Sequence, residues 1–575
     1  MTHSFRVWAP DRRRVDLVLD GHRLPMGEHD SGWWEVSDPD TRAGTRYGFS
    51  LDGGEARPDP RSLSQPDGVL GLSQVVDHAA HLWHDGEWRG RPLEGSIIYE
   101  LHTGTFSAAG TFDGVSEHIE HLARLGVTTI ELMPVAEFSG MRGWGYDGAA
   151  LFAPHHAYGG PAGLKRLVEA CHASGLAVLL DVVYNHLGPV GNFLPEFGPY
   201  FSDRYDTGWG PGLNYDGPGS EEVRRFVIDN ALMWIRDYHL DGLRLDAVQQ
   251  IVDQSPTHVL EQLAAEVDAL ESELGRTVLL VAETEVNDAR FMRSREAQGY
   301  GLDAAWSDDW HHSLHAALTG EQSGYYRHFG SLELLGRALR DGWVYDGPRS
   351  AGRLIADGTM PTDVMPRRLV VAAQNHDQVG NRAAGERLGH LVDEGSLKVA
   401  AALLLTAPFT PLIFQGEEWA SSSPFQYFTD HADEGLGRAV SDGRRREFAA
   451  FGWGPDQVPD PQDPATFERS RLDWSELDQP LHRRMLDWYR DLIRLRGRFR
   501  DGPVRVEVDA AAGHVALSRE GFTVLANLGD GEWRWPIASD ARVLLASGPS
   551  VTTSGAAATL PRSSVVIVET SKPNV

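Results

Sequence analysis

Three acidic residues, Asp246, Glu283 and Asp377, each stand at or just after the end of a short apolar run. Asp246 ends the run that begins at Gly242 and follows Arg244 by two positions, and such a fixed cation favours an ionised carboxylate. An ionised, oriented carboxylate is the form that acts as a nucleophile. An isolated arginine and aspartate at a strand end are more often a structural ion pair, so the interpretation depends on the other two acids.

The spacing of these acids suggests that they meet. Asp246 and Glu283 are separated by the length of one strand and helix unit, and Asp377 follows after further such units. Three carboxylates around one opening repel one another, so at least one keeps its proton near neutral pH. An ionised and a protonated carboxyl group on either side of a scissile bond are what glycoside hydrolysis requires.

Two histidines accompany the acids, His186 after an apolar run and His376 next to Asp377. A lone histidine is more often a packed or capping residue. Beside the acids, we expect both to be neutral donors to sugar hydroxyls. Asp181 and Asn185 could offer oxygens to calcium, but no spaced run of acids completes a shell, and we expect no metal and no cofactor.

Strands that end at one edge must position these side chains. Eight apolar runs alternate with helical segments, at residues 96–101, 127–132, 177–183, 242–246, 278–283, 304–307, 369–374 and 411–415. Continuous apolar strands joined by helices indicate a parallel sheet that is buried on both faces. Eight such units favour a (β/α)8 TIM barrel, in which the chemistry lies at the carboxyl ends of the strands.

Both ends of the chain alternate apolar and polar residues between Gly, Asp and Pro turns, which is typical of small β-sandwiches. We therefore expect a multidomain α/β protein. Residues 1–90 would form an N-terminal, immunoglobulin-like β-sandwich and residues 499–575 a C-terminal β-sandwich. The catalytic barrel would span 91–498, with an inserted lobe at about 187–218.

Composition limits the partners. The 575 residues carry a formal charge of -29 and no basic stripe, which argues against a nucleic-acid partner. The single cysteine, Cys171, excludes an intrachain disulfide and fits a reducing compartment. We find no signal segment and no apolar run of membrane length. We expect a cytoplasmic monomer with no membrane partner.

Four segments resemble the signature segments of the α-amylase family of retaining glycoside hydrolases: 181–186, 242–247, 281–283 and 375–377. The resemblance implies that Asp246 is the nucleophile, Glu283 the proton donor and Asp377 the transition-state stabiliser. It also implies that Arg244, His186 and His376 contact the substrate.

Longer segments, including 304–315, 374–381 and 416–431, are similar to the trehalohydrolase branch of that family. This implies a glycosidase that cleaves the α-1,4 bond next to the terminal trehalose of maltooligosyltrehalose and releases trehalose. Gln249 and Gln250 replace a Lys-His pair of many α-amylases, which counts against a plain amylase. We expect further substrate contacts at Leu245, Ala247, Val248, Gln249, Asp308, Asp309, Trp310, His311, His312, Gln378, Val379, Gly380 and Asn381.

Two alternatives stay open. An α-glucan branching or debranching enzyme would carry nearly the same motifs. An α-glucan-binding protein on a decayed barrel is the non-enzymatic alternative, and three intact, mutually repelling carboxylates count against it.

Overall fold

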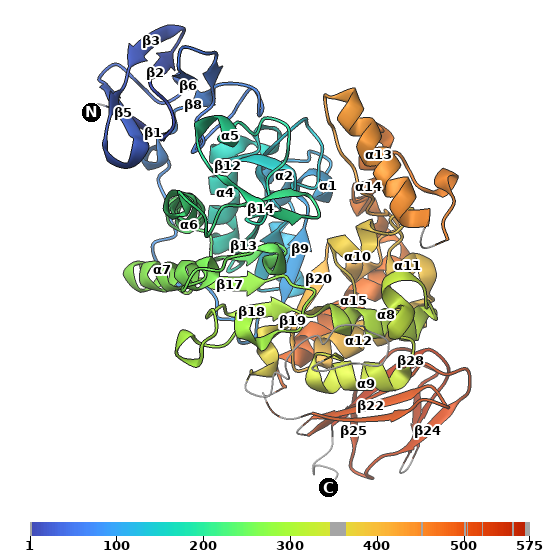
Figure 1. Ribbon diagram of the computed structural model, residues 1–575. Helices are drawn as coiled ribbons and strands as arrows, with labels where there is room; N and C mark the ends of the chain where they lie inside the picture. The colour runs from blue at the N-terminus through green and yellow to red at the C-terminus, as the bar shows by residue number, and fades with distance from the viewer. Residues whose placement is uncertain are drawn as a thin grey trace.

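The computed structural model describes residues 3–345, 364–449, 452–499, 502, 504–519, 521–554 and 557–569. A closed barrel of eight parallel strands forms its centre, between two groups of antiparallel strands (Figure 1). The barrel strands are β9 (Ile98–Leu101), β10 (Thr129–Leu132), β13 (Ala177–Val182), β16 (Gly242–Leu245), β17 (Leu279–Ala282), β18 (Ala304–Trp306), β19 (Leu369–Ala372) and β20 (Thr410–Phe414). The predicted fold class and all eight predicted strands are confirmed.

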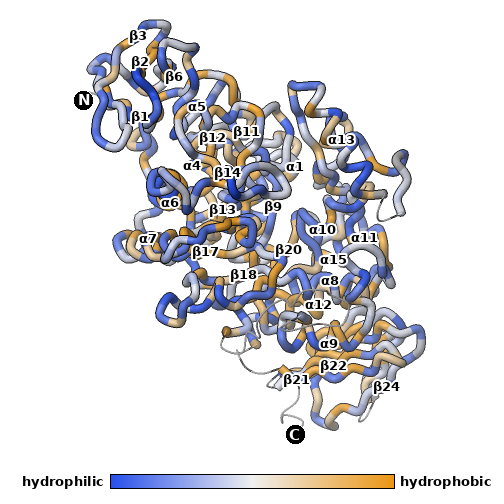
Figure 2. Tube along the Cα trace, in the orientation of Figure 1, coloured by the Kyte–Doolittle hydropathy of each residue, from blue (hydrophilic) through white to orange (hydrophobic). Residues whose placement is uncertain are grey.

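Apolar side chains hold the barrel together. Figure 2 shows hydrophobic residues along its strands, and one buried apolar cluster joins strands from around the barrel: Ile98, Leu179, Leu279, Val281, Ala304, Trp306, Val370, Ala372 and Leu412. Close strand contact also requires Gly242, because a Cβ there would lie 2.1 Å from the carbonyl oxygen of Leu279.

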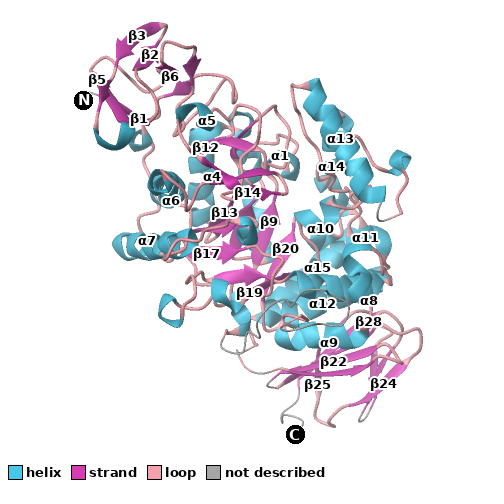
Figure 3. Cartoon of the chain, viewed as in Figure 1, coloured by secondary structure: helices cyan, strands magenta, loops and turns pink. Residues whose placement is uncertain are grey.

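Helices cover the outside of the barrel (Figure 3). The main ones are α4 (Gly160–Ala173), α6 (Ser220–Asp237), α7 (Val259–Leu274), α8 (Asp308–Thr319), α9 (Leu332–Asp341), α12 (Glu394–Thr406) and α15 (Pro480–Arg496). Within the described residues, no helix combines the length and the apolar character needed to cross a membrane.

The N-terminal strands form two sheets, with the orders β1-β5-β4 and β3-β2-β6-β7, and β8 pairs with β6. Their bounds are β1 (His3–Trp8), β2 (Val15–Leu19), β3 (His22–Pro25), β4 (Gly27–Glu28), β5 (Trp33–Asp38), β6 (Arg46–Leu51), β7 (Ala56–Arg57) and β8 (Ser73–Gln74).

The C-terminal strands also form two sheets, β21-β22-β23-β28-β25 and β24-β27-β26, and α9 and α12 pack against the larger one. Their bounds are β21 (Arg505–Asp509), β22 (His514–Arg519), β23 (Phe522–Asn527), β24 (Trp533–Pro536), β25 (Arg542–Ala546), β26 (Thr552–Ser554), β27 (Ala557–Leu560) and β28 (Ser564–Glu569).

Three excursions follow barrel strands β13, β10 and β20. The hairpin β14 (Phe201–Thr207) and β15 (Gly210–Leu213) lies in the lobe expected at about 187–218. The hairpin β11 (Ala136–Phe138) and β12 (Gly148–Pro154), which follows β10, was not predicted. Helix α13 (Glu434–Ala449) follows β20 and stands apart from the barrel, at the upper right of Figure 1.

Candidate active site

The carboxyl ends of the barrel strands surround a cavity of about 1050 Å3, which we call the mouth cavity. Asp246 directly follows β16, and Glu283 directly follows β17. Asp377 lies in the short helix α10 (His376–Gly380) after β19. All three acids line the mouth cavity, so they share one opening.

Arg244 is the cation around which the acids gather. Its Nη1 donates to Asp246 Oδ1 (2.9 Å) and to both carboxylate oxygens of Asp181 (2.9 Å each). Its Nη2 lies 3.7 Å from Glu283 Oε2, and the ring of Trp306 lies under the guanidinium. Because the Arg244 side chain is 2% exposed, its charge acts on these carboxylates with little screening by solvent.

The carboxylate of Asp246 is held from both sides. While Arg244 binds Oδ1, the Nδ2 of Asn185 donates to Oδ2 (2.8 Å). The Asp246 side chain is nevertheless 13% exposed, and it faces the mouth cavity. A fixed but accessible carboxylate is suited to attack a sugar carbon.

Glu283 lines the same cavity and is distinguished by a raised pKa. Burial raises its pKa to about 8; Arg244 opposes this rise, and the negative charges of Asp246, Asp308 and Asp377 add to it. Its Oε2 accepts the backbone N–H of Ala247 (2.6 Å), a residue in a left-handed conformation (φ 41°) that is strained for alanine. Glu283 therefore holds a proton at neutral pH, as a general acid must.

Two side chains orient Asp377 and the short helix that carries it. The side chain of Asn375 accepts the backbone N–H groups of Asp377 and Gln378 and so caps α10. The Nδ2 of Asn381 donates to Asp377 Oδ1 (2.6 Å). Both contacts fix the carboxylate relative to β19.

On balance, the surroundings of His376 do not favour the neutral form that was predicted. Its Nδ1 bonds Glu100, and its Nε2 lies 2.8 Å from the hydroxyl of Tyr146, which donates to Asp181 (2.7 Å). Burial alone would lower the pKa of His376, but the charge and the hydrogen bond of Glu100 outweigh it, so the pKa is raised. Each ring nitrogen thus lies beside an oxygen that can accept a hydrogen bond.

His186 agrees better with the prediction, because burial lowers its pKa. Its Nδ1 contacts the side-chain oxygen of Asn185, and its ring stacks on Trp209, with ring centres 5.3 Å apart. Trp209 lies between β14 and β15, and it is 58% exposed beside the cavity. An exposed indole at this position can support a sugar ring.

Amide and acidic side chains line another part of the wall. The Nε2 of Gln378 donates to Asp308 Oδ1 (3.0 Å). Burial, with the charge of Asp377, raises the pKa of Asp308 to about 7. The side-chain oxygens of Gln378 and Gln249 are buried and have no hydrogen-bond partner among the described residues. They are therefore available to hydroxyl donors of a ligand.

Some predicted contacts line the cavity and others do not. Those in the lining are His186, Arg244, Ala247, Gln249, Asp308, Asp309, His312, His376, Gln378 and Asn381; those outside it are Leu245, Val248, Trp310, His311, Val379 and Gly380. The ring nitrogens of His311 bond Ala373 O and the Tyr326 hydroxyl. Successive residues of a helix point in different directions, so residues 308–312 of α8 cannot all face one cavity.

Two of these placements have a specific structural cause. Asp309 lines the cavity, but its Oδ2 accepts Asn287 Nδ2 (2.7 Å) and the backbone N–H groups of Val344 and Tyr345. A Cβ at Gly380 would lie 2.0 Å from the ring of Trp144, so this glycine admits the indole. Both residues support the wall.

Several lining residues were missed by the sequence analysis: Trp144, Tyr146, Asp147, Glu285, Tyr325, Arg382, Tyr427, Arg444, Glu447 and Trp453. They come mainly from excursions whose packing no periodicity predicts. Two buried acids, Glu100 in β9 and Glu131 in β10, could have been recognised from the sequence. A single acidic residue within an apolar strand indicates a candidate functional site.

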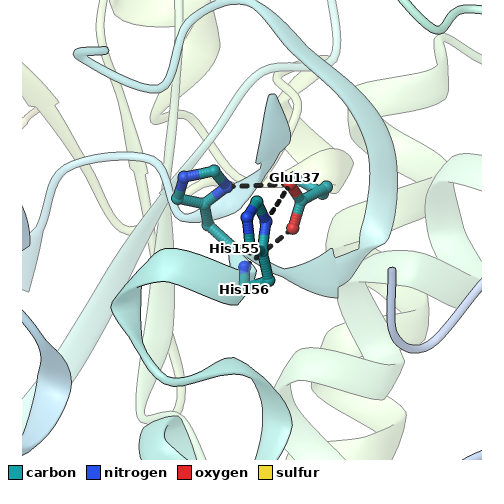
Figure 4. Close-up of side chains that lie close together, drawn as sticks. All are labelled: Glu137, His155 and His156. Carbon is teal, nitrogen blue, oxygen red and sulfur yellow. Dashed lines mark hydrogen bonds and ion pairs between the residues drawn. The ribbon is translucent and has the colours of Figure 1, made fainter. Parts of the chain in front are cut away.

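One group of three among the described residues has the ligand types and spacing for a metal ion, namely Glu137, His155 and His156 (Figure 4). The Nδ1 atoms of both histidines bond Glu137 Oε1 (3.0 and 2.7 Å), and the backbone N–H of His156 bonds Oε2 (2.7 Å). These hydrogen bonds account for the short distances. The trio braces the hairpin that carries Tyr146.

Comparison with known proteins agrees with this geometry. Residues 79–197 match the family model for the alpha amylase catalytic domain. The chain is 51% identical to the malto-oligosyltrehalose trehalohydrolase of Arthrobacter ramosus, over 92% of this chain and 94% of that protein. It is 46% identical to the same enzyme of Rhizobium sp. (strain M-11), over 98% and 97%.

A crystal structure of a Salmonella typhimurium protein assigned to the alpha amylases has a TM-score of 0.91 and 37% sequence identity. The match covers 99% of this chain and 98% of that one. With two relatives at 46% identity or more over nearly the whole chain, the relationship extends well beyond the barrel. The chain belongs to the malto-oligosyltrehalose trehalohydrolase family of alpha-amylase-type glycoside hydrolases.

Proposed function

We propose that this glycosidase cleaves the α-1,4 bond next to the terminal trehalose of maltooligosyltrehalose by retaining double displacement. Asp246 attacks the anomeric carbon while Glu283 protonates the leaving oxygen. Water, activated by Glu283 as a base, then releases the shortened maltooligosaccharide, and Asp377 stabilises the charged sugar in both steps. The observation that carries this proposal is the accessible Asp246 beside a Glu283 whose pKa is about 8.

The substrate contacts that we propose are the predicted residues that line the mouth cavity. The trehalose unit would lie against Asp308, Gln378 and Gln249. Its hydroxyls can donate to the amide oxygens that have no partner among the described residues. Leaving such a group unsatisfied costs about 1 to 3 kcal/mol. Two such groups give a preference over a maltosyl unit on the order of a hundredfold.

The test compares maltohexaose with maltotetraosyl-trehalose as separate substrates, and follows free trehalose and new reducing ends. Release of trehalose from the second, with little cleavage of the first, supports the proposal. Comparable cleavage of both would indicate an amylase, and new α-1,6 links without net hydrolysis a branching enzyme.

Further parts of the proposal concern the whole chain. We place the domain boundaries near residues 90 and 498, because the two flanking groups of strands lie on either side of these positions. We also propose a cytoplasmic monomer. The single cysteine, Cys171, is buried and free, which suits a reducing compartment.

A further inference from the structure

Helix α13 contacts the short helix α10, which carries Asp377, through the side chain of Arg444. Arg444 lies in the lining of the mouth cavity, although α13 is outside the barrel. Its Nη1 donates to Asn381 Oδ1 (2.7 Å), and its Nη2 donates to the carbonyl oxygen of Gly380 (2.9 Å). Gly380 is the last residue of α10, the short helix that carries Asp377, and Asn381 caps the C-terminus of that helix.

The guanidinium is held rigidly. It packs against two rings, 4.6 Å from the ring centre of Tyr427 and 4.5 Å from that of Phe448. Glu447 approaches Nη1 at 3.5 Å, and the Arg444 side chain is only 13% exposed. A planar group that stacks and donates two separate hydrogen bonds is a role that lysine cannot fill.

Arg444 and Asp377 together fix which way the amide of Asn381 points. A guanidinium has only donors, so the atom of Asn381 that faces it must be the oxygen. The nitrogen then faces Asp377 Oδ1, to which it donates at 2.6 Å. Without Arg444 the amide oxygen loses its donor, and the side chain of Asn381 is no longer held against Asp377 from both ends.

We infer that Arg444 is a positioning residue for the reaction and that it acts on Asp377 through Asn381. The inference rests on the proposed role of Asp377 in transition-state stabilisation. The contact also makes a complete active site depend on the docking of α13.

The test uses the full chain and whichever α-glucan the unmodified protein cleaves. Arg444→Met removes both donors and keeps the bulk against the rings. We expect kcat to fall by on the order of tenfold to a hundredfold with little change in KM. A cationic analogue of the oxocarbenium-like transition state should bind more weakly by a similar factor, and Arg444→Lys should be intermediate. Arg438→Met is the matched control, since Arg438 lies on the same helix with a side chain 71% exposed.

A double-mutant cycle with Asn381→Ala gives the sharpest result. If Arg444 acts through Asn381, the double variant is no slower than Asn381→Ala alone. The inference would be overturned if the fold-losses in kcat of the two single variants multiply in the double variant. It would also be overturned if Arg444→Met has the same kcat as the parent. Asp377→Ala is measured in parallel. If this variant keeps its activity, the proposed role of Asp377 is wrong, and not only the inference that Arg444 positions it.

Discussion

Strand β16 has an aspartate before its first residue and another after its last, and the two lie in opposite surroundings. Asp241, at the start of the strand, accepts His172 Nε2 (2.9 Å) and the backbone N–H of Val178 (2.8 Å) on one oxygen. Its other oxygen accepts Trp88 Nε1 (2.7 Å). Asp246, at the end, faces the mouth cavity. Asp241 therefore has a structural role, because both of its carboxylate oxygens are hydrogen-bonded within the chain. Asp246 remains accessible to a substrate.

The pKa shifts at the two ends differ in the same way. Near Asp241, burial would raise the pKa of Asp85, but hydrogen bonds from His172 and His239 hold it well below its usual range. Burial would lower the pKa of His172, but the hydrogen bonds and charges of Asp241 and Asp85 outweigh burial, so this pKa is raised. In the mouth cavity like charges face one another, and the pKa of Glu283 rises to about 8. Buried charge alone therefore does not identify a catalytic site.

The largest expected effect is that of Asp246→Asn. The amide keeps the shape of the carboxylate but is a poor nucleophile, so kcat should fall by on the order of 10^4-fold or more. Stopped assays of glucan cleavage measure this, with the thermal unfolding midpoint as control. Residual activity within about tenfold of the parent would exclude Asp246 as the nucleophile.

Glu283→Gln should come next. Without its acid, cleavage of natural glucans should slow by about 10^2 to 10^4-fold. Activated aryl glycosides need little protonation of the leaving group, so their first step should suffer far less. Equal losses on both substrate types would show that the proton comes from elsewhere.

Asp241→Asn should reduce stability and leave kcat nearly unchanged. Breaking a buried ion pair costs about 3 to 5 kcal/mol, which denaturant unfolding can measure. The pKa of His172 is higher in the folded chain than its value of 6.5 in the unfolded chain, so its protonation stabilises the fold. This stabilisation is complete below pH 6.5 and is lost as pH rises through the folded pKa. The pKa of Asp85 is lower in the folded chain than its value of 3.8 in the unfolded chain, so its ionised form stabilises the fold above pH 3.8. This stabilisation is lost as pH falls through the folded pKa.

The stability difference between parent and Asp241→Asn should therefore be largest between about pH 3.8 and 6.5. It should shrink in alkaline solution. A variant that keeps its stability and loses kcat would contradict the division between the two ends of β16.

The smallest effect concerns pH. Glu283 must be protonated to act as the acid, so the rate should fall as pH rises through about 8. Asp308→Asn removes a negative charge that raises this pKa, so the alkaline limb should move to lower pH. The profile of kcat against pH measures the shift. Movement to higher pH would mean that Asp308 is not a charged neighbour of Glu283.

The strand ends were predictable because apolar runs give the barrel, and the barrel brings Asp246, Glu283 and Asp377 together. The block at residues 308–312 was less predictable, since only the helix phase decides that His312 faces the cavity and Trp310 does not. Tyr146 and Arg444 arrive on excursions, and their approach depends on tertiary packing that no local pattern encodes. Glu100 raises the pKa of His376, and only their contact in the folded chain reveals this effect.

If Asp246 is the nucleophile, a covalent glycosyl-enzyme forms on it in the mouth cavity. A fluorinated α-glucosyl fluoride, which forms this intermediate faster than it releases it, traps the enzyme for peptide mapping by mass spectrometry. We predict one added fluoroglucosyl group on the peptide that contains Asp246, and products of unchanged anomeric configuration. An inverted product with no labelled peptide, or a label on another carboxylate, would show that Asp246 is not the nucleophile.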